Sequence, residues 1–129
     1  MQRVVITGMG AITPAGSGAE QLFENLCAGK NGISLLELPE EEREGCKVHV
    51  AAQVKDFDGE QYIDKKELRR MDRVTQFAMA AAAQCVEDSK ADFSTIDTPR
   101  IGVLVGSGIG GMVTHEREHK KFLEKGARR

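Results

Sequence analysis

Hydrophobic positions in this chain form three short runs with the spacing of strands, separated and followed by stretches with the spacing of helices. Arg3 to Gly8 and Arg100 to Gly106 are aliphatic, β-branched runs that end in glycine, which is typical of buried strands. From Val48 to Val54 apolar residues recur at alternate positions, which predicts a short strand with one buried face. The alternation of strands and helices predicts an α/β fold with a largely buried sheet.

Three helices are expected around these runs. The first follows a capping-box pattern, Ser17-x-x-Glu20, and ends before Gly29, a residue type suited to the position after a helix. A longer helix from Arg73 to about Lys90 begins after Asp72, and its run of alanines lets it approach a sheet closely. The third, from about Met112 to Lys125, is highly charged.

Composition indicates a single-domain intracellular protein. The 129 residues suit one domain without an internal boundary, and 40% apolar residues suffice for a core. A formal net charge of -2 argues against a general nucleic-acid binder. No apolar run approaches the roughly 18 residues of a membrane span, and the first residues lack the long apolar stretch and cleavage site of a signal peptide. We therefore expect a cytoplasmic protein. Because no strand follows the last helix, we also expect a fragment of a longer protein.

The glycine-rich end of the last run first indicates a nucleotide site. Gly106-x-Gly108-x-x-Gly111 matches the dinucleotide-binding fingerprint. That fingerprint requires an acidic residue at the end of a second strand about 20 residues later. Here a charged helix occupies that region, so a nucleotide cofactor is disfavoured. The glycines are better explained by a tight turn.

Metal and thiol chemistry are also disfavoured. His115-Glu116-Arg117-Glu118-His119 has the H-E-x-x-H spacing of zinc proteases. Its two central charged residues suit a solvated helix face, and too few residues follow to supply a third ligand. None of the cysteines has the surroundings of an activated nucleophile, and no C-x-x-C pair is present; they are Cys27, Cys46 and Cys85. We expect no metal and no organic cofactor.

A dense basic group precedes the long helix. Helical spacing places Lys66, Arg69, Arg70 and Arg73 on one side of a helical segment that also contains Lys65. A solvated face is one interpretation. The other is a docking surface for an acidic protein, because a basic patch on an acidic protein steers association.

Several motifs occur together in the order seen in one family. They are RVVITGMG at residues 3–10 with TPAG at 13–16, KDFD at 55–58, RMDR at 70–73 with QFA at 76–78, and GSGIGG at 106–111. The chain resembles the N-terminal portion of the β-ketoacyl-[acyl-carrier-protein] synthases, most of all the elongating type II enzymes. The resemblance implies an incomplete thiolase-like, layered αβαβα fold and a homodimer. It also implies acyltransferase activity, in which an acyl thioester condenses with malonyl-carrier protein.

The resemblance assigns roles to some residues and withholds them from others. Ile109, beside Gly108, matches the residue that gates the acyl-chain pocket, although ordinary core packing would also explain an isoleucine there. A second group matches the surface that binds acyl carrier protein: Lys66, Arg69, Arg70, Arg128 and Arg129. The catalytic cysteine and two histidines of the family have no match in this chain, so the chain alone is expected to be inactive.

Other functions remain open. A polyketide ketosynthase, a type I elongation enzyme and a non-catalytic chain-length factor would share these motifs, and the chain could act solely as a carrier-protein binding module. Half of a layered fold leaves sheet edges and apolar helix faces uncovered. We therefore expect the chain to need the rest of the fold, a partner or oligomerisation for stability.

Overall fold

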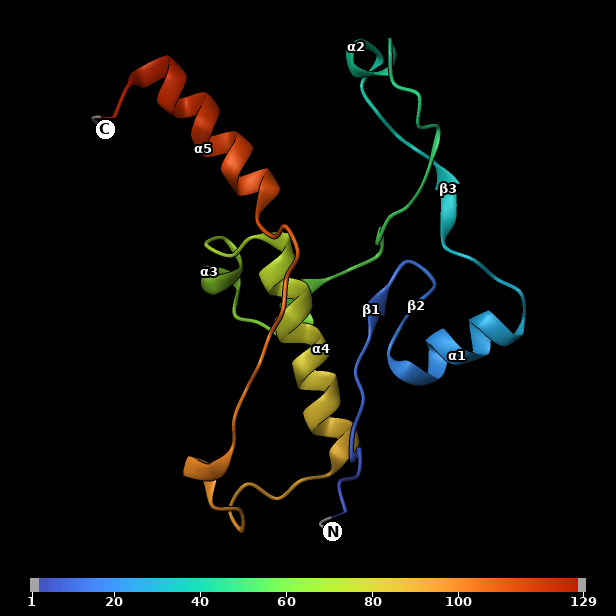
Figure 1. Cartoon of the computed structure of the whole chain (residues 1–129), viewed down its shortest axis with the longest axis vertical. Coiled ribbons are helices and arrows are strands. Elements are labelled where there is room, and N and C mark those ends of the chain that lie inside the picture. The colour runs from blue at the N-terminus through green and yellow to red at the C-terminus, as the bar shows by residue number, and fades with distance from the viewer. Residues whose placement is uncertain (1–2, 128–129) are drawn as a thin grey trace.

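A computed structural model describes residues 3–127 and arranges them around one long helix, α4 (Arg73–Ser89) (Figure 1). The charged helix α5 (Met112–Lys125) lies beyond the N-terminal end of α4. Helix α1 (Ala19–Cys27) lies beside α4 rather than beyond its end. The remaining helices are short: α2 (Glu40–Arg43), α3 (Lys65–Leu68) and the 3-10 turns η1 (Gly59–Gln61) and η2 (Thr98–Arg100).

The long helices begin and end largely where the sequence predicts. Asp72 caps α4 by accepting a hydrogen bond from the Val74 amide at 3.1 Å. Gly29, with φ of 70°, follows the end of α1 as expected. The capping-box prediction is wrong, because Gly18 is the N-cap of α1 and makes no side-chain cap. The Ser17 amide instead donates to the Gln21 side chain at 2.9 Å.

Among residues 3–127, strand pairing is limited to two antiparallel hairpins. β1 (Ile12–Thr13) pairs with β2 (Gly16–Ser17), and β3 (Ile33–Leu35) pairs with β4 (Val50–Ala52). The predicted strand within residues 48–54 is thus confirmed, but its buried face is not, since Val48 and Val50 are 58% and 54% exposed. The largely buried sheet predicted from the pattern is not formed among residues 3–127.

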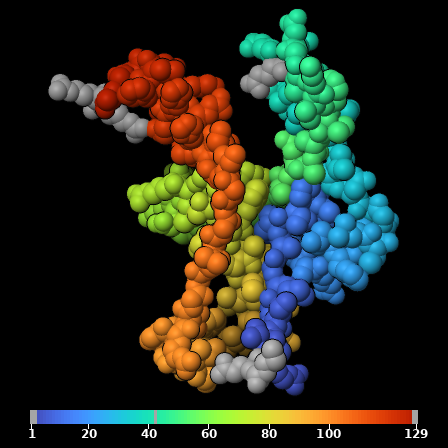
Figure 2. All heavy atoms as spheres, viewed as in Figure 1, coloured from blue at the N-terminus to red at the C-terminus, as the bar shows by residue number. Residues whose placement is uncertain are grey.

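The two aliphatic runs predicted to be buried strands are extended but unpaired within the described part of the chain. In the first run Val4 is 93% exposed, and in the second Leu104 is 98% exposed. Figure 2 shows the second run, in orange, lying uncovered across the face in view. The prediction of burial is wrong here because a strand needs a neighbouring strand for its amides and carbonyls. None of the helices within residues 3–127 has the length and apolar character needed to cross a membrane.

Within the described residues, the first run is hydrogen-bonded to another element only at and just after its end, and that element is α4. The amides of Met9 and Ala11 donate to the side chains of Asp88 and Gln84 at 2.8 and 2.9 Å. The thiol of Cys85 donates to the Gly8 carbonyl at 3.3 Å. Polar side chains of one helix therefore make the hydrogen bonds that a neighbouring strand would otherwise make.

Small residues allow this close approach. A Cβ atom at Gly10 would overlap the Ala81 carbonyl and lie 2.9 Å from the Gln84 Cβ. Ala80, on the same helix, is fully buried, and the other buried apolar side chain of the described chain is Ile63. The alanine run of α4 thus serves close packing, as predicted, although its partner is an extended segment rather than a sheet.

We predict that Gly10→Ala destabilises the chain by about 1–3 kcal/mol, because the new methyl group forces backbone away from α4. A denaturant titration of the intact protein containing this chain, followed by far-ultraviolet circular dichroism, measures the change.

Gly102→Ala is the matched control, since a Cβ there meets nothing within 4 Å. That variant should unfold within about 0.5 kcal/mol of the parent. Equal stability of the two variants would show that residue 10 is not tightly packed against α4.

Candidate functional site

The glycine turn at residues 106–111 connects the second aliphatic run to α5. Ile109 is 82% exposed, and a Cβ at Gly108 would meet open space. The end of the turn is tighter. A Cβ at Gly110 would lie 2.6 Å from the Ser107 Oγ, and Gly111 caps α5 with φ of 75°. Gly110 and Gly111 therefore determine the shape of the turn, whereas Gly108 and Ile109 are exposed to solvent.

The Asp72 carboxylate anchors this turn to α4. One of its oxygens accepts from the Val74 amide, and the other accepts from the Thr114 hydroxyl at 2.6 Å and the Thr114 amide at 3.2 Å. Val74 and Thr114 lie in the first turns of α4 and α5. Helix N-termini carry unpaired amides and partial positive charge, so one carboxylate stabilises two helix ends.

These contacts also favour the charged form of the carboxylate. The hydrogen bond from the Thr114 hydroxyl, followed by that from the Val74 amide, lowers the pKa of Asp72 below its ordinary value of 3.8. The anchor is therefore fully ionised at neutral pH.

The basic group does not form one continuous face. Lys65 pairs with Glu60 at 2.9 Å. The Arg73 guanidinium lies over the rings of Phe77 and Phe57, 4.9 and 5.9 Å from their centroids, and donates to a backbone carbonyl, that of Val54, at 2.6 Å. The prediction that Arg73 shares a face with the other cations is wrong, because α3 stops at residue 68 and Arg73 starts α4.

Three predicted carrier-binding residues remain exposed on and just after α3: Lys66, Arg69 and Arg70. No ion pair of their side chains is found among residues 3–127. Arg128 and Arg129, predicted to join them, lie outside the described residues. We call Lys66, Arg69 and Arg70 the basic segment. Arg70 is two positions from Asp72, so the basic segment immediately precedes the residue that anchors the glycine turn.

The thiols and imidazoles are dispersed. Cys85 and Cys46 donate to backbone carbonyls at 3.3 Å, and Cys27 is exposed at the end of α1. His115 and His119 stack on each other, with ring centroids 6.1 Å apart. Within residues 3–127, no three His, Cys, Asp or Glu side chains converge as a metal cage would require.

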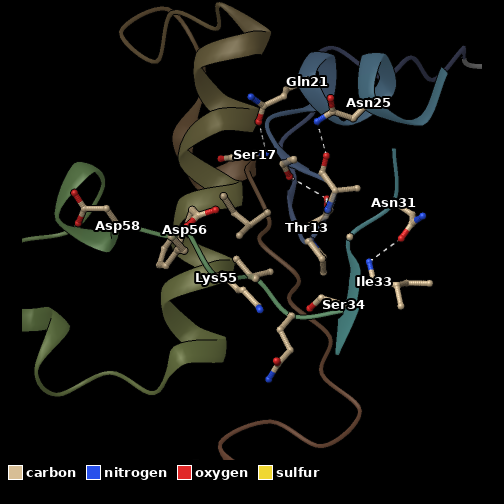
Figure 3. Close-up of a pocket in the computed structure, with 18 of the residues that line it drawn as sticks. Thr13, Ser17, Gln21, Asn25, Asn31, Ile33, Ser34, Lys55, Asp56 and Asp58 are labelled. Atoms are coloured by element: carbon tan, nitrogen blue, oxygen red, sulfur yellow. Dashed lines mark hydrogen bonds between the residues drawn. The ribbon is translucent and has the colours of Figure 1, made fainter. Parts of the chain in front are cut away.

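A pocket that sequence reasoning missed lies between the two hairpins and residues 53–62 (Figure 3). Its volume is about 500 Å³, and its wall includes polar groups such as Asn25, Asn31 and Lys55. The Ser34 Oγ, also in the wall, is buried without a hydrogen-bond partner among the described residues. Gly32 permits close contact with Pro14 in this wall, and no local sequence pattern predicts that contact. None of the predicted site residues lines this pocket.

Comparison with known sequences gives one consistent result. The sequence model of a family described as Beta-ketoacyl synthase, N-terminal domain, matches residues 1–128. A 3-oxoacyl-[acyl-carrier-protein] synthase 2 of Staphylococcus aureus (strain COL) is 48% identical over 99% of this chain and 30% of its own length. A protein of the same name from Synechocystis sp. is 39% identical over 99% of this chain and 30% of its own. The chain thus spans less than a third of these relatives.

Solved structures share the arrangement of the elements. A type II polyketide ketosynthase, in complex with its acyl-carrier protein and bound to the hexaketide, aligns with a TM-score of 0.73 at 24% identity, over 95% of this chain and 32% of that one. The ishigamide ketosynthase/chain length factor aligns with a TM-score of 0.60 at 32% identity, over 70% of this chain and 22% of that one. The fold is therefore part of a thiolase-like architecture, as expected.

We predict that Thr114→Val lowers the denaturant midpoint of the chain at pH 7, since it removes the shortest hydrogen bond to Asp72. Because the pKa of Asp72 is lowered on folding, its stabilisation is complete above pH 3.8 and is lost as the pH falls through the lowered value. The difference between the parent and Thr114→Val should therefore shrink as the pH falls below 3.8.

Thr114→Ser keeps the hydroxyl and should retain most of the midpoint at neutral pH. An unchanged midpoint in Thr114→Val at pH 7 would show that the anchor contributes little to stability.

Proposed function

The chain belongs to the β-ketoacyl synthase N-terminal domain family, and we propose that it forms the N-terminal part of a type 2 3-oxoacyl-[acyl-carrier-protein] synthase. The observation that carries this proposal is 48% identity to a protein of that name over 99% of the chain. The intact protein would elongate fatty acyl chains in the cytoplasm as a homodimer, without a metal or an organic cofactor.

The proposed reaction is a decarboxylative condensation. A cysteine thiolate attacks the acyl thioester and becomes acylated, and the sulfur of the carrier protein leaves as a thiolate that takes up a proton from water. The malonyl thioester then loses CO2, and the electron pair of the broken bond forms an enolate whose carbon attacks the acyl-cysteine. The cysteine leaves as thiolate, and the product is a 3-oxoacyl thioester on the carrier protein. Backbone amides that face the developing oxyanions would supply much of the acceleration.

We place the cysteine and its two histidines outside residues 1–129. The thiols of Cys46 and Cys85 are directed to backbone carbonyls, and Cys27 ends a surface helix. The histidines of α5 lie against each other rather than beside a thiol. These arrangements support a chain that contributes substrate contacts but not the nucleophile.

The basic segment would bind acyl carrier protein. Lys66, Arg69 and Arg70 are exposed, while the neighbouring Lys65 and Arg73 are engaged within the chain. Because these three cations form no ion pair among residues 3–127, they can pair with carboxylates of an acidic protein without breaking an existing ion pair. Such pairs mainly accelerate encounter and set orientation. Arg128 and Arg129 would extend the same surface.

Ile109 would face the acyl chain. It is a large aliphatic side chain left 82% exposed at an open position of the turn, with Gly108 beside it. Burial against an alkyl ligand would remove its apolar surface from water. Its volume would then limit the length of the acyl chain that can be accommodated.

A second candidate has its own support. The 32% identity to the ishigamide ketosynthase/chain length factor keeps open a polyketide ketosynthase or a non-catalytic chain-length factor. A chain-length factor would retain the fold without the nucleophilic cysteine, so condensing activity separates it from a synthase.

We predict that Arg69→Glu combined with Arg70→Glu weakens binding of acyl carrier protein by about tenfold or more at low salt, because attraction becomes repulsion. The loss should diminish as salt screens the charges. Titration of fluorescently labelled carrier protein with the chain measures the affinity.

Lys30→Glu combined with Lys47→Glu is the matched control, because it makes the same change in net charge at exposed positions outside the basic segment. This variant should bind within about twofold of the parent. An equal loss in both variants would mean that overall charge, rather than the basic segment, attracts the carrier.

We expect the intact protein containing this chain to release CO2 from malonyl-carrier protein and to form a 3-oxoacyl product with an acyl thioester. Failure with every acyl thioester would contradict the synthase and favour the chain-length factor.

In the same assay, Ile109→Phe should lower kcat/KM for long acyl chains about tenfold or more while leaving kcat/KM for short acyl chains unchanged.

Ile109→Val keeps an aliphatic side chain and is the control for Ile109→Phe. It should retain the parent preference for chain length. A uniform loss with all substrates would indicate that residue 109 only packs in the fold and does not contact the acyl chain.

A further inference from the structure

The two histidines of α5 present an arrangement that the proposed function does not use. His115 and His119 are four residues apart on a regular helix, so both project from the same face. Their rings are nearly parallel, with an interplanar angle of 4° and centroids 6.1 Å apart, and both residues are exposed. No other pair of histidines stacks among the described residues.

This spacing suits chelation of one ion by two imidazoles. Each ring nitrogen binds a Zn²⁺-like ion at about 2.0–2.1 Å, so both nitrogens must reach one point between the rings. Because both side chains are exposed, rotation about their side-chain torsions can bring the nitrogens together without disturbing packing. The helix already fixes the spacing, which places the second imidazole at high effective concentration once the first has bound.

The acidic residues between the two histidines are paired with basic residues of the same helix. Glu116, between the histidines in sequence, pairs with Lys120 at 2.7 Å. Glu118 lies in the same interval and pairs with Lys121 at 2.9 Å. These ion pairs support the helix on which the two ligands depend.

We propose that His115 and His119 form a two-ligand surface site for a divalent transition-metal ion of the Ni²⁺, Cu²⁺ and Zn²⁺ class, which clamps the first two turns of α5. Neutral imidazole is a preferred ligand of these ions, whereas Mg²⁺ and Ca²⁺ prefer oxygen. Water would complete the coordination. This site is distinct from the zinc-protease centre suggested by the H-E-x-x-H spacing, because it binds an ion without catalysis. The proposal does not rest on the proposed synthase activity.

The test is calorimetric titration of the untagged intact protein containing this chain with Ni²⁺, in the presence of a phosphine reductant that keeps the thiols reduced. We expect one ion per chain and no competition from excess Mg²⁺, which prefers oxygen ligands. His119→Gln and His115→Gln should each lower the affinity about 100-fold, because either change leaves a single ligand. His49→Gln removes an imidazole elsewhere and should bind as the parent does.

Amide hydrogen exchange provides a second measurement that does not depend on calorimetry. Ni²⁺ should slow exchange over residues 112–121 in the parent and in His49→Gln but not in His119→Gln. Equal Ni²⁺ affinity in the parent and His119→Gln, or displacement of Ni²⁺ by Mg²⁺, would overturn the proposal. Unchanged exchange in α5 on saturation with Ni²⁺ would overturn the clamp.

Discussion

The arrangement of the glycine turn at residues 106–111 and of the basic segment depends on the hydrogen bonds that the Asp72 carboxylate accepts. This carboxylate occupies the space between the N-terminal turns of α4 and α5, where two sets of unpaired amides and two helix dipoles favour a negative charge. Without it, little in the described residues would hold the glycine turn, since the preceding run is uncovered. The basic segment ends two residues earlier, at Arg70. A carrier protein bound there would therefore contact the same short stretch of chain that positions Ile109.

α4 organises the opposite end of the molecule by a different means. Gln84 accepts from the Ala11 amide and donates to the Ser17 hydroxyl and the Tyr62 hydroxyl at 3.1 and 2.9 Å. One amide side chain thus connects the N-terminal segment, the first hairpin and the turn after η1. Gly8 and Gly10 make this possible, because any side chain at either position would overlap the backbone of α4.

Most features that depend on neighbouring residues were predictable from the sequence, the capping box at Ser17 being the exception, and features that depend on distant partners were not. The Asp72 cap, the extent of α4 and the charged α5 follow from side chains within a few positions of each other. The aliphatic runs read as buried strands because their composition is that of a sheet interior, but burial requires partner strands that residues 3–127 do not provide. The contact between Asp72 and Thr114 joins positions 42 apart, and no local pattern predicts it. The separation of Arg73 from the other cations depends likewise on Phe57, which only folding brings near.

The uncovered aliphatic runs have a consequence for how the protein is made. Val4 and Val103 are 99 positions apart in the chain, and at about 5–20 residues per second a ribosome needs roughly 5–20 s to progress from one to the other. α4 is completed within that interval and holds Gly8 to Ala11, which shields the end of the first run early. The rest of that run has no neighbouring strand during this interval, so its aliphatic side chains stay in contact with water.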